Sequence, residues 1–290
     1  AAILDAMRLA QGMSYKAALA QLPLGGGKAV LLKPEGPFDR ERYFDKFGQF
    51  VEALKGRYVT SLDSGATIAD MDRIHLHTDY VAGLSTQGDP SPYTVTGLLY
   101  GIEALVAWKL KKHDLAGLHI ALDGLGHVGW DLASRLHERG VKLTVADINQ
   151  DLVQRAQKEF QATVVSPGQI HAVKCDVFSP CALGGIINDK TLPEIQAPII
   201  AGAANNQLAE ARHGQALLDC HIAYAVDYVI NAGGLLFAAH QYCGQSVSAP
   251  LDQQLLHIKD TLIEILEHAQ HTKTPPNEVA DHLAKQRIQA

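Results

Sequence analysis

Residues 118–129 read Leu-His-Ile-Ala-Leu-Asp-Gly-Leu-Gly-His-Val-Gly, and this stretch decides the fold. Its apolar first part predicts a buried strand, and its glycines form a G-x-G-x-x-G pattern that leads into a helix reaching Leu136. Such glycines permit a tight turn, close approach of a pyrophosphate and close packing of helix on strand, while the helix N-terminus attracts phosphate charge. The turn is therefore predicted to bind a dinucleotide through Gly124, Leu125, Gly126, His127, Val128 and Gly129.

The residues after this turn support the dinucleotide interpretation. A second predicted strand, residues 142–146, precedes Asp147, about 20 residues beyond Gly124, where a carboxylate accepts hydrogen bonds from the adenosine ribose hydroxyls. Residues 148–150 are Ile, Asn and Gln and offer no cation to a 2′-phosphate, which favours NAD over NADP. The alternative is a glycine turn in an α/β protein that binds no nucleotide.

The wider pattern predicts an α/β chain with two domains. Further apolar segments at 199–201 and 221–225 alternate with helical stretches, as in a parallel sheet. The proline-containing loop at 86–93 is a natural boundary. We expect residues 1–93 to form one α/β domain, joined by C-terminal helices within 245–290. Residues 94–244 are then expected to form a doubly wound NAD-binding Rossmann domain.

The first domain is predicted to begin with a helix that ends before Pro23. A strand over residues 29–32, a helix over 38–54 and a strand over 57–61 follow from the apolar spacing. The chain opens directly in a helical pattern without a capping residue. We therefore expect that an N-terminal part of this domain is missing from the sequence.

The composition excludes several classes of protein. Lys and Arg number 25 against 31 Asp and Glu, and this excess of acidic residues argues against a nucleic-acid partner. Apolar runs stay far below the roughly 20 residues that cross a bilayer, so no membrane span is expected. Four cysteines without CxxC spacing favour a reducing, cytoplasmic location. Despite 14 histidines there is no HExxH motif, and we expect no metal site.

Two lysines near the N-terminus are candidates for chemistry. Either Lys16 or Lys28 alone is usually a solvated surface residue. The three glycines before Lys28, however, remove side chains and let a substrate and backbone close on its ammonium group. Partial burial of this kind lowers a lysine pKa toward neutrality, as a general base requires. Asp63 is either an exposed turn residue or a partner of this group, and spacing alone does not decide.

Six segments resemble the Glu/Leu/Phe/Val dehydrogenases, most closely the leucine and phenylalanine dehydrogenase branch. They follow the family's order over nearly the whole chain, and the Gly-Gly-Gly-Lys and Ala-Asn-Asn-Gln parts are specific. The segments are residues 11–16, 22–28, 70–72, 78–81, 202–208 and 227–234.

The resemblance implies a role for each matched residue. Lys28 corresponds to the catalytic lysine, Asp63 to its proton-shuttling partner, and Lys16 to the cation that holds the substrate α-carboxylate. Asn206 is implied to orient that carboxylate, and Asn205 to lie against the nicotinamide. The positions that line the family's side-chain pocket are Ser61, Ala82, Leu235 and Ala238.

The implied reaction is the reversible, NAD-dependent oxidative deamination of an L-amino acid to a 2-oxo acid and ammonia. Because the pocket positions include no cation, an apolar substrate is expected, with Leu, Val and Ile favoured and Phe or another aromatic amino acid next. The resemblance also implies a homo-oligomer, a dimer or an octamer, with residues 1–93 as the α/β substrate and oligomerisation domain. The sequence departs from the family at Lys33, which stands where a short polar residue is usual, and in a shortened loop at 86–89.

Two alternatives stay open. A 2-hydroxy-acid dehydrogenase would share the Rossmann half but needs a catalytic histidine and an arginine for the carboxylate, and the two lysines argue against it. A catalytically silent NAD-binding homologue would keep the glycine-rich turn without turnover. Ammonia-dependent oxidation of NADH with 2-oxo acids separates these alternatives from the amino-acid dehydrogenase.

Overall fold

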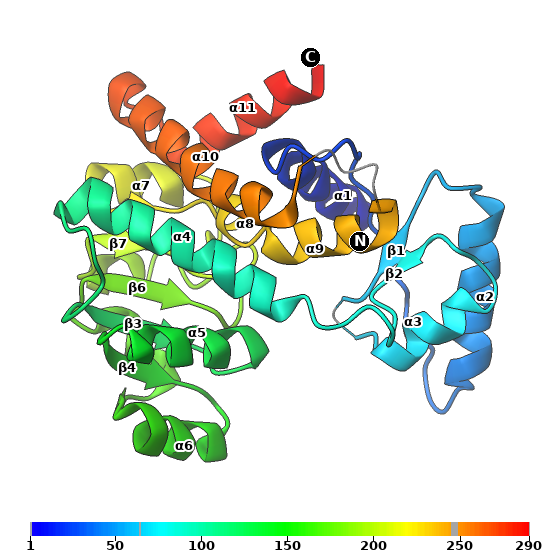
Figure 1. Cartoon of the computed structure of the whole chain (residues 1–290), viewed down its shortest axis with the longest axis horizontal. Coiled ribbons are helices and arrows are strands. Elements are labelled where there is room, and N and C mark those ends of the chain that lie inside the picture. The colour runs from blue at the N-terminus through cyan, green and yellow to red at the C-terminus, as the bar shows by residue number, and fades with distance from the viewer. Residues whose placement is uncertain (1, 64, 245–248, 290) are drawn as a thin grey trace.

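The computed structural model describes residues 2–63, 65–244 and 249–289. Residues 1, 64, 245–248 and 290, which fall within the domain ranges expected from the sequence, lie outside the described residues. The chain forms a larger part built on a parallel sheet and a smaller part built on two helices and two short strands (Figure 1).

Within the described residues, six parallel strands form the sheet of the larger part, in the order β5-β4-β3-β6-β7-β8. The chain starts in the middle at β3, runs outward to β5, and then crosses back to β6, so that the switch point lies between β3 and β6. This is the strand order of the doubly wound dinucleotide-binding fold, and the Rossmann prediction is confirmed. The strands are β3 (His119–Asp123), β4 (Lys142–Ala146), β5 (Thr163–Val164), β6 (Val177–Pro180), β7 (Ile199–Ile200) and β8 (Ala223–Tyr224).

Helices cover this sheet because its central strands are apolar on both faces. Ile120, Ala121 and Leu122 of β3 are completely buried, as is typical of a parallel strand between two helical layers. α10 crosses α4 in close contact (Figure 1). The helices are α4 (Ser91–Leu110), α5 (His127–Glu138), α6 (Gln150–Phe160), α7 (His213–Asp219), α8 (Asp227–Ile230), α9 (Gly233–Cys243) and α10 (Leu251–Thr272), with 3-10 turns at Pro167–Ala172 and Leu192–Glu194.

The smaller part has a hydrophobic cluster of its own. It consists of α2 (Arg40–Ala53), β1 (Thr60–Ser61), α3 (Ile68–His75) and β2 (Val81–Ala82). Phe44, Met71, Ile74 and Val81 are buried together between these elements. Both helices have N-terminal caps, since Asp39 accepts from the Arg42 N–H, and Thr67 and Asp70 form a capping box.

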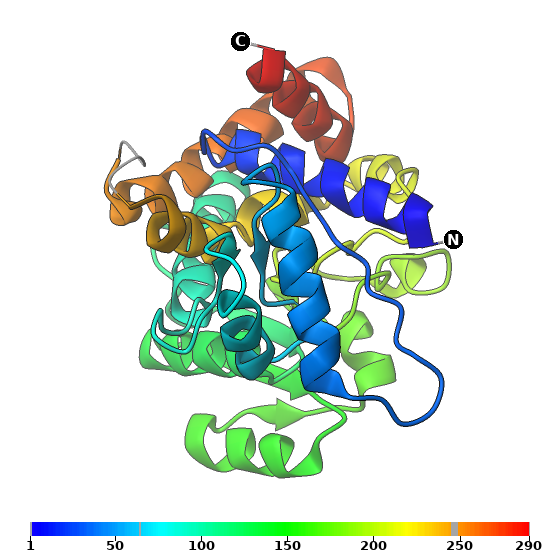
Figure 2. The same cartoon turned by 90° about the vertical axis from the view of Figure 1, so that its right-hand side faces the viewer.

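The first and last described helices pack against each other. α1 (Ala2–Leu19) lies beside α11 (Pro276–Gln289), as Figure 2 shows, and Arg287 Nη1 donates to the Leu19 carbonyl at 3.1 Å. Tyr15, Ala17 and Leu19 belong to the hydrophobic core of the larger part. α1 is therefore fixed to the larger part, and the expected division of the chain at residue 93 stays a prediction.

One predicted strand is wrong. Residues 29–32 form no strand, and Leu31 and Leu32 are 36% and 70% exposed. β1 and β2 pair with each other in parallel, and residues 29–32 lie outside this sheet, so the apolar run has no neighbouring strand in the described part of the chain. The second predicted strand of this region, over 57–61, is shorter than expected and contains only Thr60–Ser61.

Candidate active site

The loop that carries Lys28 closes onto α1. The Gly26 N–H donates to Ser14 Oγ at 3.1 Å, and Ser14 Oγ donates to the Ala10 carbonyl at 3.2 Å. A Cβ atom at position 26 would lie 2.1 Å from the Ser14 backbone nitrogen, so only glycine fits this contact. The glycine run thus brings Lys28 to the end of α1 that carries Lys16.

Lys28 and Asp63 form an ion pair across this loop. The Lys28 side chain is about three-quarters buried and the Asp63 side chain half exposed, so one face of the pair is accessible to solvent. Burial lowers the pKa of Lys28 below its ordinary value. The structure therefore places these two candidate residues in direct contact.

Lys16 lies in the same region as a second perturbed lysine. The pKa of Lys16 is lowered to about 8, mainly by burial and also by the positive charge of Lys28, while the negative charge of Asp227 acts in the opposite direction. Two lysines and two carboxylates, Asp63 and Asp227, thus interact within one site. An anion such as a substrate carboxylate would relieve the repulsion between the two ammonium groups.

Asp227 was not singled out from the sequence. It is the first residue of α8, directly after β8, and only 8% exposed. Its carboxylate accepts the Tyr228 N–H at 2.8 Å and the Gln207 N–H at 3.2 Å. The available signal was its place at the carboxyl end of a predicted strand, inside one of the matching segments, where ligand-binding residues of α/β sheets gather.

Asn205 and Asn206 lie on the loop after β7, and both are exposed. Asn231 Nδ2 donates to Asn205 Oδ1 at 2.8 Å and to the Ala203 carbonyl at 3.0 Å. The buried Gln207 side chain donates to two carbonyls of the same loop. The exposed asparagine side chains therefore sit on a backbone that buried amides hold in place.

The four positions proposed for the side-chain pocket lie on two neighbouring parts of the fold, the β1–β2 pair and helix α9. Ser61 and Ala82 are direct partners in the pairing of β1 with β2. β2 contacts α9, the helix that carries Leu235 and Ala238. Ala82 is buried, Leu235 and Ala238 are partly buried, and Ser61 is exposed.

The glycine-rich turn has the geometry that a pyrophosphate requires. Gly124 has φ 96°, and a Cβ at position 129 would lie 2.0 Å from the Gly124 carbonyl oxygen, so both positions need glycine. At Gly126, by contrast, no described atom lies within 4 Å of the place of a Cβ. Gly126 also stands at the N-cap of α5, which is capped by no described side chain. An open surface beside free helix N–H groups fits an anionic group.

Asp147 lies beside this turn at the end of β4. Its carboxylate accepts the Leu125 N–H at 2.6 Å and the Asn149 N–H at 2.7 Å. A second carboxyl group, Asp123, is only 8% exposed, and burial together with the charge of Asp147 raises its pKa to about 6. The turn, α5 and Asp147 together fit the pyrophosphate and ribose of a dinucleotide.

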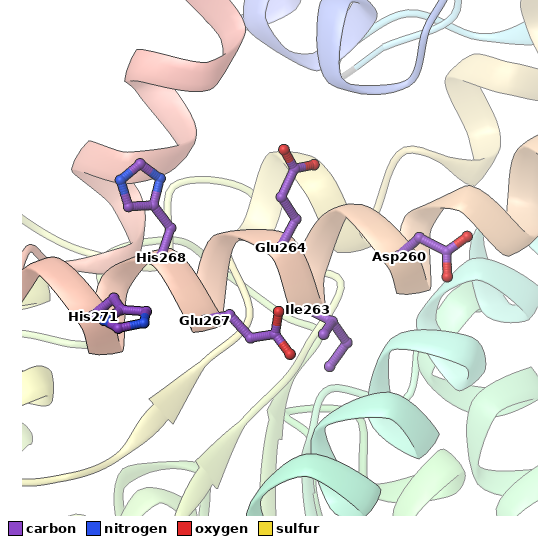
Figure 3. Close-up of a pocket in the computed structure, with 6 residues that line it drawn as sticks. All are labelled: Asp260, Ile263, Glu264, Glu267, His268 and His271. Atoms are coloured by element: carbon purple, nitrogen blue, oxygen red, sulfur yellow. The ribbon is translucent and has the colours of Figure 1, made fainter.

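A shallow surface hollow lies elsewhere, along α10 (Figure 3). All of its lining side chains come from this one helix, and Glu264 also pairs with Arg287 of α11. The lining residues are Asp260, Ile263, Glu264, Glu267, His268 and His271. None of the candidate residues named above contributes to it, so the lysines and the glycine-rich turn remain the candidate active site.

Comparison with known proteins decides the family. Residues 2–80 match the family model described as "Glu/Leu/Phe/Val dehydrogenase, dimerisation domain", and residues 144–289 match the model "Glutamate/Leucine/Phenylalanine/Valine dehydrogenase". The chain belongs to the Glu/Leu/Phe/Val dehydrogenase family. It is an amino-acid dehydrogenase, as the resemblance predicted, and a nicotinamide cofactor follows from membership of this family.

Relatives within the family have different named substrates. Leucine dehydrogenase of Geobacillus stearothermophilus is 44% identical over 99% of this chain and 79% of its own length. L-Tryptophan dehydrogenase of Nostoc punctiforme is 43% identical over 99% of this chain and 82% of its own. A crystal structure of L-tryptophan dehydrogenase from Nostoc punctiforme superimposes with a TM-score of 0.87 at 40% identity, covering 100% of this chain and 84% of the other.

No helix of the described residues has both the length and the apolar character needed to cross a bilayer.

Proposed function

We propose that this chain catalyses the reversible NAD-dependent oxidative deamination of an apolar L-amino acid, with Leu, Val and Ile as favoured substrates. The observation that carries the proposal is the ion pair of Lys28 with Asp63 beside the second lysine, Lys16. This arrangement supplies an anchor for a carboxylate and a proton-transferring pair in one place.

In the proposed reaction, each candidate residue has a separate role. Lys16 binds the α-carboxylate, and Asn206 orients it. The turn at 124–129 and Asp147 would hold NAD, which would accept the hydride from Cα of a substrate whose amine is neutral, leaving a protonated C=N group on the substrate. Transfer of the Lys28 proton to Asp63 within their ion pair leaves Lys28 neutral, and water then adds to the imine carbon while Lys28 takes a proton from this water. Protonated Asp63 gives its proton to the nitrogen. The C–N bond breaks, ammonia leaves, and Asp63 takes back the hydroxyl proton as the carbonyl of the 2-oxo acid forms.

Asp147 and the residues after it support NAD over NADP. Its carboxylate lies next to the turn, and residues 148–150 provide no cation for a 2′-phosphate. Repulsion and the loss of ribose hydrogen bonds are together worth a few kcal/mol, or roughly a hundredfold in kcat/KM.

The side-chain pocket supports an apolar substrate. Ser61, Ala82, Leu235 and Ala238 contain no cation, so a second carboxylate, as in glutamate, would be desolvated without a partner. Ala82 and Ala238 leave room for a branched side chain beside Leu235. The similarity to an L-tryptophan dehydrogenase makes an aromatic amino acid the second candidate.

We also propose that the protein works as a homo-oligomer, a dimer or an octamer, in the cytoplasm. The support for assembly is the match of residues 2–80 to a dimerisation domain. Light scattering of the full-length protein tests it, and a monomer at working concentration would refute it.

The deciding experiment measures kcat/KM for Leu, Val, Ile, Phe, Trp and Glu with NAD and with NADP. The expected order places the branched aliphatic amino acids first, with NAD favoured roughly a hundredfold over NADP. A preference for glutamate would overturn the apolar pocket, and a tenfold preference for Phe or Trp would replace the aliphatic choice by the aromatic one. Absence of turnover, with NADH still bound, would support the silent homologue.

A further inference from the structure

Asp227 is a buried carboxylate that lies between the two halves of the proposed substrate site. It begins α8, and α8 packs on α1, where the rings of Tyr15 and Tyr228 approach to 6.4 Å between centroids. α1 carries Lys16, and the loop after β7 carries Asn206. We propose that Asp227 is a positioning residue of the deamination reaction. It favours the positively charged form of Lys16, and it fixes the backbone beside Asn206. This inference rests on the proposed function, which it deepens.

The backbone contacts of Asp227 give the first argument. One carboxylate oxygen accepts the Tyr228 N–H of its own helix, and the other accepts the Gln207 N–H at the end of the asparagine loop. The Asn206 N–H contributes to the same interaction. A single side chain thereby fixes the loop of the carboxylate-orienting asparagine against the helix that faces Lys16.

The charges give the second argument. Lys16 is surrounded by Lys28 on the neighbouring loop and Asp227 on α8, and Lys28 already pairs with Asp63. Asp227 in turn is surrounded by Lys16, by Tyr224 at the end of β8 and by Tyr228. The negative charge of Asp227 thus counteracts the effect of burial on the pKa of Lys16.

The consequence concerns the protonation of Lys16. Only the protonated form attracts a substrate carboxylate, and burial together with Lys28 favours the neutral form. The charge of Asp227 raises the pKa of Lys16 and so favours its protonated form. Burial raises the pKa of Asp227 itself, while the backbone N–H groups and Lys16 stabilise its charged form. Removing this charge is expected to leave Lys16 in place but to lower its pKa, so that a larger fraction of the amine is neutral near pH 7.5.

The neighbouring helices keep this geometry fixed. Tyr228 Oη donates to Asp281 Oδ1 of α11 at 2.7 Å, and Arg287 of α11 donates to the Leu19 carbonyl at the end of α1. α1, α8 and α11 are therefore linked by hydrogen bonds that do not involve Asp227, so that replacement of Asp227 need not detach α1.

The test is a direct titration of Lys16. Trace acetylation with acetic anhydride across pH 6–11, measured by mass spectrometry of the peptide containing Lys16, gives the pKa of this amine without any need for turnover. Asp227→Asn is expected to lower this pKa by about one unit, a tenfold change in the ratio of neutral to charged amine at a given pH. Asp227→Glu keeps the charge and is expected to restore most of the shift. An unchanged titration in Asp227→Asn would overturn the proposal.

Asp176→Asn is the matched control. Asp176 also accepts a backbone N–H, that of His119 at 2.8 Å, but is not among the groups whose charges act on Lys16. Its variant is expected to leave the Lys16 titration unchanged. If Asp227→Asn does not fold, Asp227→Ser, whose smaller hydroxyl still accepts an N–H, carries the same expectation.

Kinetics separate this proposal from the proposed function. With Asp227→Asn at pH 7.5, KM for the amino acid is expected to rise about threefold, because a fall of about one unit from a pKa of about 8 reduces the charged fraction of Lys16 by that factor. The change in kcat is expected to be smaller, because a carboxylate anchor acts in ground and transition states alike. A wild-type protein that deaminates no amino acid would refute the proposed function, while the titration would still decide whether Asp227 controls Lys16.

Discussion

The Lys28 ammonium donates to the Asp63 carboxylate, joining the loop after α1 to the loop after β1 over 35 residues of sequence. The contact combines a lysine whose pKa is lowered by burial with a carboxylate that is half exposed. Such a pair moves a proton over a short distance while the exposed oxygen exchanges protons with solvent or with a leaving amine.

Replacing Lys28 tests whether this pair carries the chemistry. Lys28→Ala is expected to lower kcat by roughly 10²–10⁴, the usual contribution of a positioned general base. NADH affinity, measured by fluorescence titration, is expected to stay near the wild-type value, because the glycine-rich turn is untouched. Lys33→Ala, an exposed lysine on the following loop, is the control and should keep full activity. Near-normal turnover in Lys28→Ala would remove this lysine from the mechanism.

The pKa of Lys16 predicts how carboxylate binding changes with pH. Its value of about 8 means that the amine is charged below pH 8 and progressively neutral above it. The inhibition constant of 4-methylpentanoate, which has no amino group of its own, should be constant below pH 8. Above that it should weaken by about tenfold per pH unit as the cation disappears. Constant inhibition up to pH 10 would contradict the role of Lys16 as the carboxylate anchor.

Two glycines of the turn are expected to respond differently to alanine. A Cβ at position 129 meets the Gly124 carbonyl, so Gly129→Ala should destabilise the fold, by more than about 2 kcal/mol in urea unfolding. Position 126 has open space, so Gly126→Ala should change stability by less than about 1 kcal/mol while weakening NADH binding at least tenfold. Equal NADH affinity in Gly126→Ala and wild type would argue against a pyrophosphate at this place.

The raised pKa of Asp123 predicts a dependence of stability on pH. Because its pKa is about 6 in the folded state and ordinary in the unfolded state, the folded protein binds more protons between about pH 4 and 6. Its ionisation therefore costs stability as the pH rises through this window, by at most about 3 kcal/mol. Asp123→Asn should be more stable than wild type at pH 7 and lose this advantage by pH 4. An advantage of the same size at both pH values would disprove this account.

The larger part of the fold could be predicted because its sequence signals are local. The strand over Lys142–Ala146 is an apolar run between turn signals, and the glycine turn defines the strand before it and the helix after it. The apolar run at 29–32 carries a similar signal but forms no strand, because strand formation also requires a neighbouring strand, and that information lies elsewhere in the chain.

The candidate site likewise contains residues that the sequence predicts and residues that only the structure reveals. Lys28 and Lys16 were found because three glycines and a matching motif flank them. Asp227 was missed because its significance depends on the packing of α8 against α1, which sequence spacing does not reveal. The requirement for glycine at position 26 also depends on the three-dimensional structure, because Ser14 occupies the space that a side chain at this position would need.

The hydrogen bond from Arg287 to Leu19 spans 268 residues of sequence and has a consequence for the timing of synthesis. At about 5–20 residues per second, a ribosome needs roughly 15–50 seconds to make the chain between these positions. α1 leaves the ribosome early in that interval, while the helix that holds its end has not yet been made. The lysine at the end of α1 reaches its final surroundings only after α11 has emerged, so an incomplete nascent chain should have no working substrate site.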